Sequence, residues 1–91
     1  MEQSVKIIKL SEVITLTKLS KTSVYERVKS GLISPPFSLG GRSAGYFEHE
    51  IQGVLAAMSA GYSNEQIKKI VKAMIQKRQD SANDLLKHLA A

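Results

Sequence analysis

Residues 11–31 read SEVITLTKLSKTSVYERVKSG, and this stretch decides the fold. Ser11 and Ser20 each precede a helical run, and a serine hydroxyl at an N-cap accepts a hydrogen bond from an unpaired N–H of the first turn. The pattern predicts a short helix over residues 12–17, a tight connection, and a second helix over about 20–30. Gly31 follows where a left-handed residue usually ends a helix. Two short helices joined so closely indicate a helix-turn-helix.

The second predicted helix has one apolar and one polar side. At about 100° per residue, Val24 and Val28 point to the same side. The opposite and flanking positions carry hydrogen-bonding residues: Lys21, Thr22, Ser23, Tyr25, Glu26 and Lys29. Such a face is either solvated or used for recognition, and the short helix and tight turn before it favour recognition.

Residues 32–47 read LISPPFSLGGRSAGYF and predict a small β-hairpin, called the wing from here on. Pro35 and Pro36 stop helix formation. Phe37 and Leu39 alternate with Ser38 as in a strand, and Gly40-Gly41 is a turn signal. Arg42 falls at or near the hairpin tip, where an arginine can reach a phosphate or a narrow minor groove. The alternative is a surface arginine on a mobile loop.

A third helix is predicted over residues 48–60, followed by a fourth over about 64–79. The third has Glu48 and Glu50 in its first turn, where the helix dipole favours acids, and Gly61 ends it. Its core stripe follows helical spacing: Ile51, Val54, Leu55 and Met58. Ser63 to Gln66 match a capping box that starts the fourth helix.

The fourth helix separates apolar from basic residues. Ile67, Ile70, Val71 and Met74 cluster on one arc, and Lys68, Lys69 and Lys72 lie on the other side. We expect these lysines to form a solvated face, with DNA contact as the less favoured alternative. Leu85, Leu86 and Leu89 then either continue this helix or form another one, and they pack back, fray or pair with a second chain.

Composition narrows the classes of function. The 91 residues correspond to one domain, and 13 basic against 8 acidic residues give a net charge of +5. This charge favours an anionic partner, nucleic acid or a membrane surface. No apolar run is long enough to span a membrane, and the first residues lack an apolar leader, so we expect a cytoplasmic protein.

The same composition argues against catalysis. Without cysteine the chain has no disulfide, no thiolate zinc site and no cysteine nucleophile. Its only histidines, His49 and His88, lie far apart in the sequence, and His49 is expected on an exposed helix turn. No nucleophile elbow, phosphate loop or metal pattern is present. We therefore expect no metal, no cofactor and no enzyme activity.

These elements predict a mainly α winged helix-turn-helix with a small two-stranded wing. We expect a DNA-binding domain over residues 1–62 and a helical extension over 63–91 that packs on it or serves self-association. The predicted contacts to double-stranded DNA come from the second helix and the wing: Ser20, Lys21, Thr22, Ser23, Tyr25, Glu26, Lys29, Arg42 and Ser43.

The stretch from Leu10 to Leu55 resembles the small phage-type AlpA regulators. The pieces that match are Ser11-Glu12-Val13, Leu16-Thr17-x-Leu19-Ser20-Lys21-x-Ser23-Val24-Tyr25, Lys29-x-Gly31, Pro36, Leu39-Gly40-Gly41-Arg42, Gly45-Tyr46 and Glu50-Ile51. The chain also resembles the DNA-binding part of MerR-type regulators, through Gly31-Leu32-Ile33, Glu50-Ile51 and Gly61-Tyr62-Ser63-x-Glu65-Gln66-Ile67. Having neither cysteines nor an added domain, it is not expected to be a sensor.

The AlpA resemblance implies a transcriptional regulator of prophage or genomic-island genes, often an integrase gene. Some relatives are excision factors that bend attachment-site DNA, which is one alternative; a protein-interaction module that binds no DNA is another. Further partners are a second copy or a cooperative array through the last helix, an integrase, and RNA polymerase. The chain departs from the family at Lys21 and Glu26, where arginine is common, at Ser30, where a basic residue is frequent, and at Tyr46, where tryptophan is usual.

Overall fold

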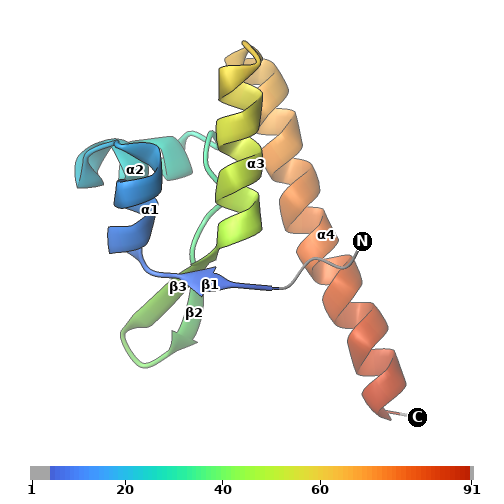
Figure 1. The fold of residues 1–91 in the computed structure, drawn as a ribbon. Helices are drawn as coiled ribbons and strands as arrows, with labels where there is room; N and C mark the ends of the chain where they lie inside the picture. The colour runs from blue at the N-terminus through green and yellow to red at the C-terminus, as the bar shows by residue number, and fades with distance from the viewer. Residues whose placement is uncertain (1–4, 91) are drawn as a thin grey trace.

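The structure is a computed structural model that describes residues 5–90, with four helices and one small sheet in that range (Figure 1). The elements follow the order β1 (Ile7–Ile8), α1 (Leu10–Thr17), α2 (Lys21–Lys29), β2 (Phe37–Gly40), β3 (Ser43–Phe47), α3 (Glu48–Ser59) and α4 (Asn64–Ala90). This confirms the predicted mainly α helix-turn-helix with a β-wing. Within the described range, no helix is both long and apolar enough to cross a membrane.

The first helix begins earlier than predicted. Its N-cap is Lys9, so Ser11 lies inside the first turn and does not cap it. The Glu12 carboxylate accepts a hydrogen bond from the Lys9 backbone N–H at 3.3 Å, and the Glu12 backbone N–H donates to the Lys9 carbonyl at 3.0 Å. An acid three residues after the N-cap can satisfy its amide, and here this replaces the serine cap.

The helix-turn-helix itself is confirmed. The Ser20 hydroxyl caps α2, and Gly31 ends it with a φ of +80°. The Leu32 N–H reaches the Arg27 carbonyl at 2.8 Å and the Gly31 N–H reaches the Val28 carbonyl at 3.1 Å. These two bonds form a Schellman motif, which needs a left-handed residue at the glycine position.

The sheet has three antiparallel strands in the order β1-β3-β2, one more than the predicted wing. In the wing, Phe37 pairs with Gly45 and Ser38 with Ala44. The added strand β1 pairs Ile7 with Phe47 and Ile8 with Tyr46. A methyl group on Gly45 would lie 2.5 Å from Ile7 Cγ2 and 3.1 Å from Leu39 Cδ1, so the bare backbone lets the outer strands close over β3.

The core lies where the two short helices, the sheet and the first half of α4 meet around α3. Its fully buried members come from every element except β2: Ile8, Val13, Val24, Ile33, Tyr46, Ile51, Val54, Ala57, Ile67 and Val71. The core therefore continues beyond residue 62 into the predicted extension. The capping box at its start is confirmed, because the Ser63 N–H donates to Gln66 Oε1 at 2.9 Å and the Gln66 N–H to Ser63 Oγ at 3.2 Å.

Helix α4 is one continuous helix of 27 residues, about 40 Å long at 1.5 Å per residue. Its second half extends past the rest of the fold (Figure 1), and every residue over 79–90 is exposed. Leu85, Leu86 and Leu89 are 61%, 60% and 72% exposed. They continue the helix, one of the two predicted outcomes, and no other part of residues 5–90 covers them.

Candidate nucleic-acid interface

The start of α2 is held rigidly by its own serines. The Ser20 Oγ accepts a hydrogen bond from the Ser23 backbone N–H at 3.1 Å. The Ser20 hydroxyl in turn donates a hydrogen bond to Ser23 Oγ at 3.0 Å. Ser23 is half-buried. Of the predicted site residues, these two therefore have a structural role in the N-cap, which fixes the direction in which the following side chains leave the helix.

The outer face of α2 is uncovered. Val24 is fully buried and Val28 half-buried against the core, as the 100° periodicity predicts. The predicted recognition residues lie on the other side, and all are exposed: Lys21, Thr22, Tyr25, Glu26 and Lys29. This face carries hydroxyl, ammonium and carboxylate groups, which together can donate to or accept from base edges.

Lys21 and Tyr25 form a small unit on this face. The Lys21 Nζ lies 5.8 Å from the centroid of the Tyr25 ring, within the range of a cation–π interaction. Tyr25 is half exposed, so its hydroxyl and ring edge are available to a partner. The stacking limits the positions of the lysine charge and holds it near the N-terminal end of the face.

The turn before α2 is tight because one residue takes an unusual conformation. Lys18 ends α1 with a φ of +61°, which is rare for a residue with a side chain. Its N–H donates to the Ile14 carbonyl at 2.8 Å, and the Leu19 N–H donates to Thr17 Oγ1 at 3.2 Å. Half-buried Leu19 then fills the corner between the helices, as predicted.

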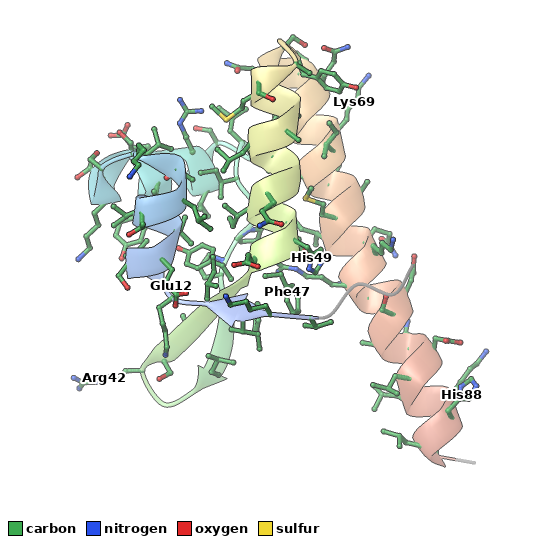
Figure 2. All side chains as sticks on the ribbon, viewed as in Figure 1. Glu12, Arg42, Phe47, His49, Lys69 and His88 are labelled. Carbon is green, nitrogen blue, oxygen red and sulfur yellow. The ribbon has the colours of Figure 1, made fainter. Side chains whose placement is uncertain are left out.

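The wing presents its arginine at the tip. Gly40 and Gly41 both have positive φ, 99° and 56°, and the Gly40 N–H donates to Ser38 Oγ at 3.1 Å. Arg42 and Ser43 are exposed, and Figure 2 shows Arg42 pointing away from the body of the molecule. In this view α2 and the wing tip lie on the side away from α4. The structure thus brings the predicted α2 residues and the wing residues onto one side of the fold.

A buried ion pair at the base of the wing was not predicted. Glu50 is only 2% exposed and accepts two hydrogen bonds from Arg78 of α4, one of them from Nε to Oε2 at 2.9 Å. The Arg78 Nη2 also donates to the Pro35 carbonyl at 2.8 Å. Glu50 was expected only to sit in the dipole field of the first turn of α3. The contact spans 28 residues, but a charged residue four positions after Met74 in an apolar stripe was a usable signal.

Aromatic rings complete this base. The Arg78 guanidinium carbon lies 5.5 Å from the Phe37 ring centroid and 5.3 Å from that of Phe47, so the arginine joins β2, β3, α3 and α4. His49 is half-buried beside Phe47, and its Nδ1 has no hydrogen-bond partner within the described chain. The expectation of an exposed His49 is therefore wrong, because the wing base packs against the first turn of α3.

Comparisons with known proteins agree with this architecture. The family model described as "Prophage CP4-57 regulatory protein (AlpA)" matches residues 6–56, from β1 through most of α3. The chain is 30% identical over 56 residues to the uncharacterized protein ORF88 of Enterobacteria phage P4, covering 62% of this chain and 64% of the phage protein. No solved structure matches. The resemblance to MerR-type regulators stays a prediction.

Proposed function

The chain belongs to the AlpA family of prophage regulatory proteins, and on that premise we propose that it is a cytoplasmic, sequence-specific transcriptional regulator that binds double-stranded DNA. One observation carries the proposal: the polar face of α2 is uncovered while its opposite face is locked into the core. A recognition helix needs this combination, because its base contacts depend on a fixed orientation.

In the proposed complex α2 enters the major groove. Thr22 can bond to several bases, Lys29 can donate to guanine, and Glu26 can accept from the amino group of cytosine. Lys21, steadied by Tyr25, reaches the adjacent backbone. Base contacts of this kind specify sequence, whereas phosphate contacts position the protein.

The wing would add contacts beside the groove. Arg42 carries five donors in a planar fork, which suits a phosphate or a narrow minor groove, and the Ser43 hydroxyl lies next to it. Each phosphate that the protein neutralises makes the slope of log K against log salt steeper by about 0.9, where K is the association constant for DNA. We assign most of the affinity to such contacts and most of the specificity to α2.

A second copy on a neighbouring site is the proposed partner of the exposed leucines. Ala82, Leu85 and Leu89, all exposed, follow one another at spacings of three and four, as in a short coiled-coil seam. At 100° per residue the charged residues of this part, Asp80, Asp84 and Lys87, lie on the opposite side, so two such faces can meet without like-charge repulsion.

Sedimentation of the full chain and of a chain ending at residue 79 tests this pairing, with and without DNA. The proposal predicts a larger species for the full chain alone or on DNA carrying two sites. Identical monomeric behaviour of both chains in every condition would refute it, and capture of an integrase or RNA polymerase by the leucines would replace the second copy as partner.

Selection from random duplex DNA by the purified protein tests the function itself. An enriched motif supports specific binding. Inverted repeats would indicate a symmetric dimer, and direct repeats a cooperative array of the kind an excision factor forms. Retention of all sequences alike would refute base reading by α2 and favour a protein-interaction module. Because the aligned part spans 64% of the phage P4 relative, partners of the whole protein are part of the proposal.

A further inference from the structure

We infer that Lys68, Lys69 and Lys72 of α4 bind the phosphate backbone of the DNA next to the site of α2. The inference rests on the proposed function and widens its interface. A shallow groove carries it, because this groove is lined on one side by Ser30 and Gly31 at the end of α2 and on the other by residues of α4 that include the three lysines and Glu65.

The start of α4 lies directly against the end of α2. A Cβ atom built on Gly31 would lie 3.8 Å from Lys68 Cγ, so the aliphatic stem of this lysine begins at the α2 terminus. Asn64, in the first turn of α4, shares a second groove with Ser30 and the exposed Glu26. A duplex seated on α2 therefore meets the beginning of α4 as the next surface.

The wing tip and the lysine groove lie in different parts of the fold. Figure 2 shows Arg42 at the wing tip and Lys69 near the upper end of α4, across α3 from α2 in this view; Lys68 is the lysine that approaches the end of α2. A duplex that contacts α2 in its major groove presents backbone on both sides of that groove. The wing tip serves one side, and the lysine groove is placed to serve the other.

The charges of α4 are unevenly distributed. Residues 64–79 carry five basic side chains (Lys68, Lys69, Lys72, Lys77 and Arg78) against Glu65, whereas residues 80–90 carry Lys87 against Asp80 and Asp84. The positive charge is therefore concentrated at the α2 end of the helix, although Arg78 is already paired with Glu50.

The lysines have little to neutralise them within the fold. Lys68 pairs with Glu65 at 3.6 Å, but Glu65 is 81% exposed and such surface pairs are weak. Lys69 and Lys72 form no ion pair with any residue in the described range. Like charges one turn apart, as at Lys68 and Lys72, destabilise a helix slightly. A row of phosphates would relieve this repulsion, and flexible lysine stems adapt to phosphates as point charges.

The test compares two double variants with the same loss of charge. Lys69→Gln/Lys72→Gln removes the unpaired lysines of the groove, and Lys77→Gln/Lys87→Gln removes two exposed lysines further along α4. Each protein is titrated with a duplex of mixed sequence between about 50 and about 200 mM salt. Because all four side chains are exposed, unchanged circular dichroism and thermal midpoints will show that folding is intact.

We expect the groove variant to reduce the slope of log K against log salt by about two, since each lost phosphate contact removes about 0.9. The control should keep the slope within about half a unit of that of the unaltered chain. The loss should be equal on a selected and on a mixed sequence, because phosphates carry no sequence information.

Equal losses in the two variants would overturn the inference, since net charge alone would explain them. If the unaltered chain binds the duplex and the groove variant binds it with the same affinity and the same salt slope, the inference is also overturned, while the proposed function stands. If the unaltered chain binds no duplex at the lowest salt, both the proposed function and this inference fail.

Discussion

Replacing Arg78 by methionine is expected to destabilise the fold severely. Methionine retains a flexible apolar stem beside Phe37 and Phe47 but leaves Glu50, 2% exposed, without its partner. Breaking a buried ion pair by removing one partner costs about 3–5 kcal/mol. A domain of 91 residues has a total stability of about 5–14 kcal/mol at roughly 0.05–0.15 kcal/mol per residue, so the loss is a large share of the whole.

Urea unfolding followed by circular dichroism measures this loss, with Lys77→Met as a matched control on an exposed neighbouring position. The control should stay within about 0.5 kcal/mol of wild type. The variant Glu50→Leu/Arg78→Met removes both charges and should recover most of the loss, because an apolar pair avoids the buried unpaired charge. A loss below about 1 kcal/mol in Arg78→Met, or a double variant as unstable as the sum of its single changes, would refute this reasoning.

Three further predictions concern the interface and the core. Arg42→Ala should weaken specific and non-specific DNA binding alike and reduce the salt slope by about 1, measured by fluorescence titration; an unchanged slope would remove the wing from the interface. Thr22→Ala should cost about 1–3 kcal/mol on the selected site and much less on mixed sequence, and equal losses on both would refute base reading. Burial, and secondarily the charge of Tyr25, raises the pKa of Tyr46, so stability should fall as pH rises above about 10, where the unfolded tyrosine ionises first. Tyr46→Phe should reduce this fall and Tyr62→Phe, at an exposed position, should leave it unchanged; the reverse order in pH-dependent unfolding would contradict the assignment.

Local signals predicted the parts of the fold that local chemistry determines. Ser20 caps the start of α2 and Gly31 ends it, as expected, because an N-cap serine and a glycine with left-handed backbone act on residues only a few positions away. The wing followed from its proline and glycine positions for the same reason. For the apolar run over residues 4–10, the sequence is compatible with an extended or a loosely packed segment, because the two residues of β1, Ile7–Ile8, are too few to show an alternation.

The sequence predicted which residues of α2 form the exposed face of the candidate site. It did not predict the contacts between elements that support the wing beside it. Helical periodicity placed Thr22, Tyr25 and Lys29 on the exposed side of α2, as the structure has them. The Arg78–Glu50 pair joins residues 28 positions apart, so the pattern of α4 can show that Arg78 interrupts an apolar stripe but not that Glu50 is its partner. The lysines of α4 were assigned to solvent because only the folded chain brings them beside the end of α2.

The glycines of the wing divide it into two zones with different tolerance to change. Nothing lies within 4 Å of a methyl group built on Gly40 or Gly41, so only the backbone conformation restrains the tip. At Gly45 the restraint comes from neighbouring side chains, since a methyl group there would meet Ile7 and Leu39. The tip residues Arg42 and Ser43 can therefore diversify while the root stays constant. In evolution or in the laboratory, such a hairpin can acquire a new target through substitutions at its tip, while the side-chain packing at its root stays unchanged.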